Sequence, residues 1–267
     1  MLKIQQFIAR NRRNRLIAKI NNYCLEFNRN YENFDYNFYS NGEYALLKRI
    51  SDDLSIKIIV DVGANIGEYA TLAAKIFPCA KIYALEIVPY TAVQLKAYCK
   101  DHANIDVFNI GLSDAEGQEQ VKFLPQDYLL STCVDNLLEI STGIQTQVID
   151  CSVTSGDKFC LQNKIGLIDF LKIDVEGYEH KVIQGFREML SSGKIRVMQF
   201  EYGWASIITK FLLKDFYDYL ESFGMKVGKV YPQYVDFNKY HFADETFLGA
   251  NYVAVSSSEK SLIERLS

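Results

Sequence analysis

Acidic residues and glycines follow several short apolar runs of this chain, and these residue types can bind a nucleotide and move protons. The first such run leads into DVGANIGE, Asp61 to Glu68. Gly63 and Gly67 permit positive φ and a close approach of the backbone to a ligand. Asp61 offers a carboxylate to the ammonium group of an amino-acid ligand, directly or through water. The next run ends at Glu86, which is placed to accept both hydroxyls of a ribose.

The glycine pattern of this turn favours one kind of nucleotide. A dinucleotide fingerprint requires G-x-G-x-x-G, whereas the turn reads G-x-N-x-G, with Asn65 in place of the middle glycine and no third glycine after it. The pattern therefore favours an adenosyl amino acid over a pyrophosphate. A nicotinamide-dependent oxidoreductase is the alternative, and an ordinary β-to-α turn explains the glycines if they are taken alone.

Three carboxylates at the ends of two later runs are candidates for a general base: Asp174, Glu176 and Glu201. If the two runs are neighbouring parallel strands, these side chains converge on one cleft. Asp174 and Glu176 also suit a helix N-terminus, where acids are favoured in any case. The same carboxylates could hold Mg²⁺, but no metal-ligand spacing is recognisable and we expect no metal site. His180, on the helix between, is more typical of a structural histidine.

Short apolar runs alternate with amphipathic stretches from Lys57 onward, which predicts βαβ units and an α/β fold with a doubly wound, mainly parallel, seven-stranded sheet. The expected strands cover residues 57–62, 81–86, 106–112, 168–173, 196–202, 225–231 and 251–256. Helices are expected over residues 68–77, 90–101, 178–190 and 213–223. The stretch 113–147 is less regular, with a short strand at 121–124.

The first twenty residues contain six basic side chains and no acidic one, among apolar residues at helical spacing. This pattern predicts a basic amphipathic helix. It is compatible with weak contact to a membrane surface, with a transit peptide, or with a helix that docks on the domain or frays. Residues 28–41 are expected to be irregular, and Ser40 with Glu43 has the form of a capping box for a helix to Ile50.

We therefore expect an N-terminal helical extension over residues 1–50, one α/β domain over 51–257 and a C-terminal tail over 258–267. With 267 residues, 49% of them hydrophobic and 23% charged, the chain can bury a sizeable core. A net charge of -4 argues against nucleic acid as a partner. Six scattered cysteines without a C-x-x-C pair, and no apolar run long enough to span a bilayer, favour a cytoplasmic protein.

Five segments, in order, resemble the motifs of FkbM-type S-adenosylmethionine-dependent methyltransferases. They are DVGANIG, EIVP from Glu86, GLSDAEG from Gly111, FLKIDVEGYE from Phe170 and MQFEYG from Met198. The resemblance covers about residues 37–255, and KIDVEG is its most specific part. It implies a Rossmann-like class I methyltransferase fold, S-adenosylmethionine as methyl donor, and O-methylation of a sugar, a glycan or another natural-product hydroxyl.

Carried over by position, the resemblance places Asp61, Gly63, Asn65 and Gly67 at the donor, Glu86 on its ribose, and Ser113 with Asp114 at its adenine. The chain departs from the family pattern at Ile87 and Val88, which separate Glu86 from Pro89 and could shift the next helix. Trp204 and the segment 203–247 are expected to shape the acceptor pocket, although core packing explains a lone tryptophan equally well. A catalytically silent scaffold of the same fold is a further alternative, and the sequence does not name the acceptor.

Overall fold

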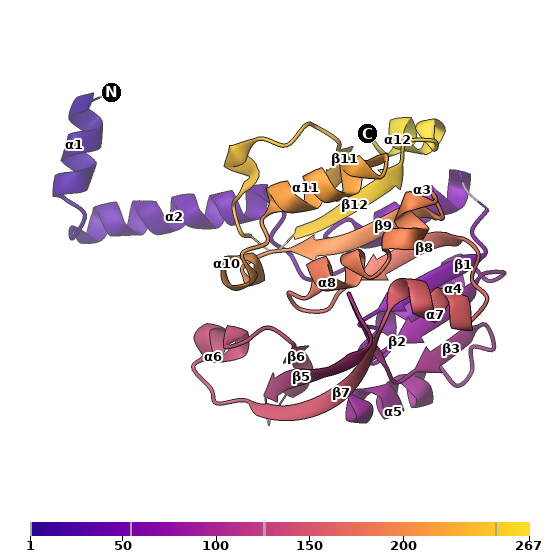
Figure 1. Cartoon of the computed structure of the whole chain (residues 1–267). Coiled ribbons are helices and arrows are strands. Elements are labelled where there is room, and N and C mark those ends of the chain that lie inside the picture. The colour runs from indigo at the N-terminus through magenta and orange to yellow at the C-terminus, as the bar shows by residue number, and fades with distance from the viewer. Residues whose placement is uncertain (1, 54, 125–126, 249) are drawn as a thin grey trace.

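The computed structural model describes residues 2–53, 55–124, 127–248 and 250–267. It consists of an α/β body and a helical arm at the N-terminus that projects from one side of it (Figure 1). The body contains one large sheet between two layers of helices, and a smaller sheet beside the carboxyl ends of the central strands.

The large sheet has eight strands in the order β11-β10-β12-β9-β8-β1-β2-β3. Neighbouring strands from β9 to β3 are parallel, whereas β12, β10 and β11 pair in antiparallel fashion. The bounds are β1 Ile58–Val62, β2 Lys81–Leu85, β3 Ile105–Phe108, β8 Ile168–Ile173, β9 Ile195–Tyr202, β10 Met225–Val230, β11 Val235–Asp236 and β12 Ala250–Ser256. The chain starts at β1, builds outward to β3 and returns to β8 on the other side of β1. Ligands of open α/β sheets bind at such a reversal of strand order, outside the carboxyl ends of the strands.

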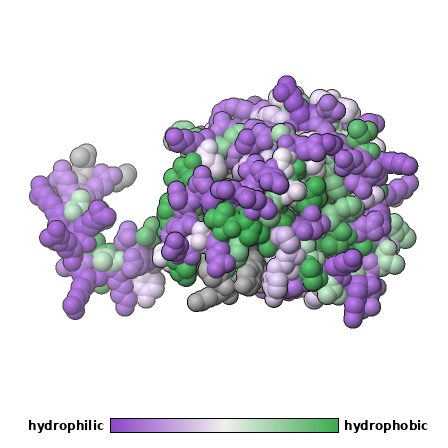
Figure 2. Space-filling model, turned by 60° about the horizontal axis from the view of Figure 1, so that its bottom comes forward, coloured by the Kyte–Doolittle hydropathy of each residue, from purple (hydrophilic) through white to green (hydrophobic). Residues whose placement is uncertain are grey.

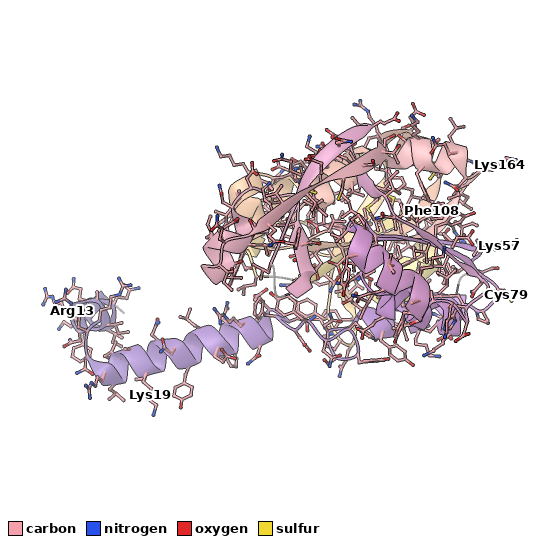
Figure 3. The ribbon with its side chains drawn as sticks, turned by 90° about the horizontal axis from the view of Figure 1, so that it is seen from below. Arg13, Lys19, Lys57, Cys79, Phe108 and Lys164 are labelled. Atoms are coloured by element: carbon pink, nitrogen blue, oxygen red, sulfur yellow. The ribbon has the colours of Figure 1, made fainter. Side chains whose placement is uncertain are left out.

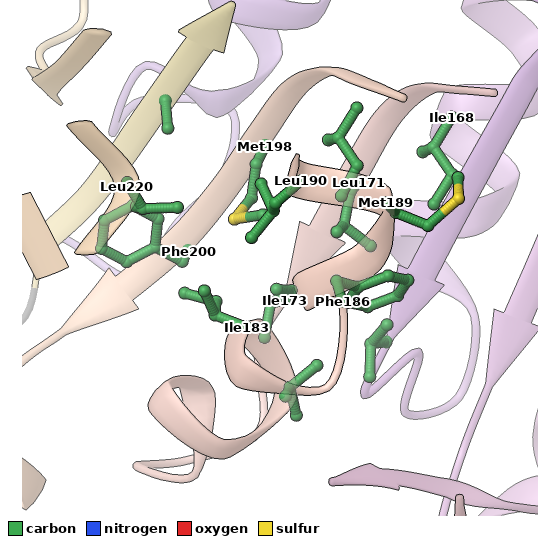
Figure 4. Packing of buried hydrophobic residues seen from close by; sticks show 14 of the residues in the cluster. Ile168, Leu171, Ile173, Ile183, Phe186, Met189, Leu190, Met198, Phe200 and Leu220 are labelled. Atoms are coloured by element: carbon green, nitrogen blue, oxygen red, sulfur yellow. The ribbon is translucent and has the colours of Figure 1, made fainter. Parts of the chain in front are cut away.

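The sheet is buried on both faces, so the expected doubly wound α/β architecture is confirmed. All six residues of β8 are buried, as the continuous apolar run of a central parallel strand requires. Figure 4 shows Ile168, Leu171 and Ile173 of this strand packed against the helical segment that carries Phe186 and Met189. The helices on this face are α7 Gly156–Gln162, α8 Glu179–Gln184, α9 Arg187–Ser191 and α11 Leu213–Ser222, and those on the other are α3 Glu43–Asp53, α4 Glu68–Ile76, α5 Pro89–Tyr98 and α12 Lys260–Leu266.

The strand expected over residues 106–112 is divided between two sheets, which corrects the prediction. β3 ends at Phe108, and the chain then leaves the large sheet. Asn109 is positioned at this exit because its side-chain amide donates to the carbonyl oxygens of Glu86 and Ile87, at 2.9 and 3.1 Å. The smaller sheet has the order β4-β7-β5-β6. Its strands are β4 Gly111–Ser113, β5 Gly117–Leu124, β6 Asp127–Thr132 and β7 Gln147–Ser155, and the short helix α6 Leu137–Thr142 lies between the last two.

The large sheet also has one strand more than the seven expected. The addition is the two-residue strand β11, which forms a hairpin with β10. A short 3₁₀ helix, η1 Phe242–Asp244, follows on the way to β12. The helix expected over 178–190 is broken into α8 and α9 near Gly185, where a Cβ atom would lie 2.0 Å from the carbonyl oxygen of Ser113.

The helix predicted to begin after Ser40 is present, but the capping box is not. Ser40 Oγ donates instead to Asp35 Oδ2, at 2.6 Å. The side chain of Asn41 accepts from the backbone amide of Glu43, at 3.0 Å. The carboxylate of Glu43 points into the body, where it accepts from Gln199 Nε2 at 2.6 Å. Glu43 thus has a buried partner on β9 beside a local one, the side-chain amide of Asn41, which donates to its other carboxylate oxygen at 2.7 Å.

The packed body extends beyond residues 51–257 at both ends. Leu47 and Ile50 of α3 are fully buried, and so are Leu262 and Leu266 of α12, which contacts α3. The segments assigned to an extension and a tail therefore contribute to the core. Of the expected extension, the helices α1 Leu2–Arg10 and α2 Arg15–Tyr31 project from the body, and α2 covers the first four residues of the stretch expected to be irregular. No helix in the described ranges combines the length and the apolar character needed to cross a membrane.

Candidate donor and acceptor pockets

The turn between β1 and α4 is shaped by glycines that no larger residue can replace without strain. Gly63 has φ +80°, and a Cβ atom there would lie 1.8 Å from the carbonyl oxygen of Asp174. The amides of Gly63 and Ala64 both donate to the carbonyl oxygen of Leu85, at 2.9 and 2.8 Å. The turn is therefore clamped between the ends of β2 and β8. Gly67, with φ +97°, lets α4 begin close to α5.

Glu86 follows β2 and is held in place by two backbone amides. Its carboxylate accepts from Asn65 at 3.0 Å and from Val88 at 2.8 Å. Burial raises the pKa of Glu86 to about 7, although these two hydrogen bonds act in the opposite direction. α5 begins at Pro89. The two residues inserted before Pro89 thus leave the helix start in place, and one of them supplies an amide to the carboxylate.

Asp61 lies beneath the turn with no solvent exposure. Neither of its carboxylate oxygens has a hydrogen-bond partner within the described residues. Burial raises the pKa of Asp61 to about 6; the nearby Lys172 ammonium lowers it, and the carboxylates of Asp174 and Glu43 raise it. An unpaired buried carboxylate is costly, and a cationic group of a ligand would offset that cost.

Lys172 is the buried cation of this region, and sequence reasoning gave it no role. Its ammonium donates to Asp174 Oδ2 at 2.7 Å and lies 4.6 Å from the centre of the Tyr69 ring. Burial opposes its charge, but the carboxylates of Asp174, Glu43 and Asp61 outweigh burial and raise the pKa of Lys172. Asp174 is thereby paired, which suits it to hold the strand ends together more than to accept a proton.

A pocket lies at the carboxyl ends of β1, β2 and β8, and we call it the donor pocket. Gly63, Asn65, Glu86, Asp174 and Glu176 of the expected site line it. The structure does not bring the other expected donor residues to its wall. Asp61, Gly67, Ser113 and Asp114 are not among its lining residues. Further lining residues that the sequence did not single out are Ile87, Thr91, Ile110, Leu112, Val121, Ser131, Thr132, Cys133 and Tyr178.

The side chains of Ser113 and Asp114 contact other residues of the protein and do not line the donor pocket. Ser113 is 1% exposed and donates to Asp114 at 3.2 Å. Asp114 forms an ion pair with Lys181, at 2.6 Å. Burial raises the pKa of Asp114, but the hydrogen bond and charge of Lys181 outweigh it and lower that pKa overall. The apolar side chains of Ile87, Ile110 and Val121 line the donor pocket, whereas those of Ser113 and Asp114 do not.

A second pocket, which we call the acceptor pocket, shares Glu176 with the first. Glu201, Trp204 and Tyr36 line it, together with His180. Trp204 is 49% exposed and stacks on Phe34 at 6.3 Å between ring centres, so this tryptophan is a surface residue of the pocket and not part of the core.

Glu176 is the residue that separates the two pockets. Its φ of +54° is unusual for a residue with a side chain, and Thr132 Oγ1 fixes the loop by donating to its carbonyl oxygen at 2.6 Å. Glu176 is partly open to solvent, but the protein packed around its carboxyl raises the pKa of Glu176 to about 8, and Asp174 and Glu179 add to the effect. Burial also raises the pKa of Glu201 well above its ordinary value, with Asp174 and Glu176 as further causes. Both carboxyls hold protons more tightly than free ones do.

His180 lines the acceptor pocket but is engaged in packing. Its ring stacks on Phe211, 5.1 Å between centres. Burial lowers the pKa of His180, and the neighbouring Lys181 adds to this. The stacking on Phe211 gives His180 a packing role beside its place in the pocket wall.

A buried polar network behind the pockets was not foreseen from sequence. Gln199 Nε2 donates to Glu43 at 2.6 Å and to Asn251 at 2.8 Å, and Tyr69 donates to Gln199 Oε1 at 3.1 Å. Its members come from α3, β9, β12 and α4, which lie far apart in the chain. The local sequence does not predict such a network, because each of its members is a single polar residue within an otherwise apolar helix or strand.

The polar groups in the donor pocket and beneath it fit an adenosyl amino acid. The carboxylate oxygens of Asp61 and the hydroxyl of Thr91 are buried and have no hydrogen-bond partner among the described residues. Glu86 retains capacity to accept hydroxyl donors beside its two backbone amides. Over the same part of the chain, no group of three or more His, Cys, Asp or Glu side chains is arranged to hold a metal ion.

The strand order, the glycine turn after the first strand and the acidic residue after the second together define a class I methyltransferase fold. A family model described as the methyltransferase FkbM domain matches residues 61–227. The chain belongs to the FkbM methyltransferase family.

Individual relatives are distant. AMB antimetabolite synthetase AmbE of Pseudomonas aeruginosa is 28% identical over 159 residues, an alignment that covers 48% of this chain and 8% of that protein. The crystal structure of an FkbM methyltransferase from Methylobacillus flagellatus matches with a TM-score of 0.48 and 16% identity, over 74% of this chain and 44% of that one. Fibrillarin of Aeropyrum pernix, solved with S-adenosyl-L-methionine bound, matches with a TM-score of 0.41 and 17% identity, over 75% of this chain and 66% of that one.

Proposed function

We propose that this protein transfers a methyl group from S-adenosylmethionine to a hydroxyl group of a small molecule, a sugar or a glycan. The observation that carries the proposal is the junction of the two pockets at Glu176. One pocket has the acidic strand ends suited to an adenosyl amino acid, and the other has carboxylates and an aromatic wall. A single acidic side chain reaches both.

Two acids and a glycine have chemical tasks at the donor under this proposal. Asp61, from beneath the turn, attracts the ammonium group of the donor, and Glu86 accepts the ribose hydroxyls. Gly63 lets the backbone pass close to the ligand. When bound, S-adenosylmethionine supplies an electrophilic methyl group on a sulfonium.

The acceptor pocket positions a hydroxyl and removes its proton. Transfer by in-line displacement depends mainly on orientation, which the wall of Trp204 and Tyr36 provides. Glu176 in its ionised form takes the proton, and Glu201, with its raised pKa, donates a hydrogen bond to a second acceptor oxygen. Asp174, paired with Lys172, orients the loop that carries Glu176.

Calorimetric titration with S-adenosylmethionine tests the donor half of the proposal. We expect saturable binding that Asp61→Asn and Glu86→Gln each weaken by roughly 10- to 100-fold, because each removes a charge-assisted contact. Glu68→Gln is the matched control, since Glu68 is an exposed acid in the first turn of α4. Absence of saturable binding to the unmodified protein would overturn the proposal.

Transfer of a labelled methyl group to a panel of sugars and polyols tests the acceptor half. Glu176→Gln is expected to keep donor affinity and to lower the rate of transfer by about 10²- to 10⁴-fold, the range for loss of a general base. If Glu176→Gln transferred methyl groups as fast as the unmodified protein, the assignment of the base would be wrong.

A further inference from the structure

The helical arm formed by α1 and α2 is a separate surface that the methyl-transfer site does not use. α2 contains no buried residue, and every described residue from 3 to 10 is exposed. Figures 1 and 3 show the arm extending away from the body in two views, and Figure 3 labels Arg13 and Lys19 on it. In Figure 2 the arm stands apart, with hydrophobic residues exposed among hydrophilic ones. Exposed apolar side chains on a helix without a partner indicate a binding surface.

One side of α2 is apolar along its whole length. The residues follow one another at intervals of four, three, four and four positions, which places them on one face of a helix. They are Leu16, Ile20, Tyr23, Phe27 and Tyr31, and each is at least 51% exposed. Ile20, Tyr23, Cys24 and Phe27 with Glu26 also line a shallow hollow on this face. In α1 the apolar residues Ile4, Phe7 and Ile8 have the same helical spacing.

The arm is also strongly basic. The first twenty residues carry Lys3, Arg10, Arg12, Arg13, Arg15 and Lys19 without an acid, whereas the whole chain has a net charge of -4. Lys19 lies next to the apolar face of α2, with its ammonium 5.9 Å from the centre of the Tyr23 ring. The arm therefore presents an apolar face with cations at its margin, on a protein that is otherwise acidic.

We propose that the arm binds the surface of a membrane that contains anionic lipids. An apolar face enters the boundary between headgroups and acyl chains, while the adjacent cations meet lipid phosphates. A second copy of the chain fits less well, because pairing the apolar faces would bring two basic segments together. Nucleic acid would satisfy the cations but would leave the apolar face in water.

The arm is joined to the body at the rim of the acceptor pocket. Asn33, just after α2, donates from its side-chain amide to the carbonyl oxygens of Asn41 and Val230, at 2.7 and 3.0 Å. Phe34 stacks on Trp204, and the next aromatic residue, Tyr36, lines the pocket. A bound arm would hold this rim near the membrane. If the proposed methyl transfer is correct, this geometry suits an acceptor that is itself carried at a membrane surface.

Co-sedimentation of the full chain with vesicles tests the proposal. We expect the protein to pellet with vesicles of phosphatidylglycerol and phosphatidylcholine, and much less with phosphatidylcholine alone. The triple variant Arg12→Gln, Arg13→Gln, Arg15→Gln should lower the partition coefficient by on the order of 100-fold, since each cation near an anionic surface contributes several-fold. Added salt should weaken binding by the unmodified protein.

The apolar face is tested with a pair of variants on one helix. Ile20→Ser with Phe27→Ser should reduce partition by roughly tenfold or more, because two side chains no longer enter the lipid. Leu25→Ser is the matched control: Leu25 is 55% exposed but lies half a turn away from the apolar face, and its loss should change partition by less than about twofold. Circular dichroism of each variant checks that the body is folded.

Three results would overturn the proposal: no pelleting with anionic vesicles, equal pelleting with vesicles of phosphatidylcholine alone, or the same loss of binding for Leu25→Ser as for the variant of the apolar face. If sedimentation velocity instead shows a dimer that Ile20→Ser with Phe27→Ser dissociates, without a change in vesicle binding, the face joins two copies. Because the assay contains no S-adenosylmethionine, its outcome is independent of the proposed methyl transfer.

Discussion

At the scale of single residues, Glu86 in the donor pocket and Asp61 beneath it are expected to make donor binding dependent on pH. Burial raises the pKa of Asp61 to about 6 and that of Glu86 to about 7. A ligand that places an ammonium and hydroxyl donors beside them binds their ionised forms. Protonation therefore competes with binding as the pH falls through these values.

We expect the affinity for S-adenosylmethionine to fall by on the order of 10- to 100-fold between about pH 8 and pH 5. Calorimetry across this range measures it. Asp61→Asn and Glu86→Gln should each bind more weakly and depend less on pH, whereas Glu68→Gln should follow the unmodified protein. A flat profile for the unmodified protein would show that neither carboxylate meets a charged or hydroxyl-bearing part of the ligand.

Gly63 allows a second prediction, concerning stability. Gly63→Ala introduces a methyl group where the carbonyl oxygen of Asp174 is 1.8 Å away, at a φ of +80°. The turn must move or unfold, so we expect a loss of about 3 kcal/mol or more in the free energy of unfolding. Urea titration measures it. Gly166→Ala is the control, because no atom lies within 4 Å of the added Cβ, and it should change the free energy by less than about 1 kcal/mol.

The sequence identified the residues of this site that depend on local order, and missed those that depend on distant contacts. Gly63, Asn65 and Glu86 could be found because a β-to-α turn and a strand end place them wherever the fold exists. Lys172 lay inside a recognised motif, two positions before its partner Asp174, but the groups that surround the pair, Asp61, Glu43 and Tyr69, come from β1, α3 and α4. Thr132 could not be found, because residues 113–147 show no periodic pattern and its contact to Glu176 spans 44 positions.

At the scale of elements, periodicity predicted the central strands well because both of their faces are buried. β1, β2, β8 and β9 lie within one or two residues of the expected ranges. The strand that changes sheets after Phe108 was predicted as a single one, since apolar residues continue through Ile110 and Leu112. What divides it is a side-chain contact of Asn109 with the end of β2, which apolar spacing does not record.

The C-terminal helix gives a prediction at this scale. α12 was expected to be a tail, yet Leu262 is fully buried against the layer that contains α3. We expect Leu262→Ala to reduce the free energy of unfolding by about 2 to 5 kcal/mol, through lost burial and the cavity left behind. Chemical denaturation measures the change. Glu264→Ala, two positions away and exposed, should alter it by no more than about 0.5 kcal/mol; an equal effect of both would mean that α12 does not pack on the body.

At the scale of the whole molecule, the protein divides into a body that folds around the sheet and an arm that adds little to its stability. Among the residues that the structure describes, the two hydrophobic clusters on the faces of the large sheet contain none before Phe38. The contacts with the body that lie nearest the arm are made by residues after α2: Asn33 donates a hydrogen bond to β10, and Glu32 forms an ion pair with Lys229. Removal of the arm up to Tyr31 leaves both contacts in place.

Deletion of residues 2–31 is therefore expected to leave the melting temperature within about 2 °C of the full chain, since almost no apolar area buried in the body is lost. Differential scanning calorimetry measures the change, and donor titration should give the same affinity for both forms. Deletion up to Phe38 is the informative contrast. This longer deletion also removes Glu32, Asn33 and Phe34, the residue that stacks on Trp204. It should lower the melting temperature by several degrees. If deletion of residues 2–31 lowered the melting temperature as much as deletion up to Phe38, the arm would be part of the fold. A partner outside the chain would then not explain its exposed apolar face.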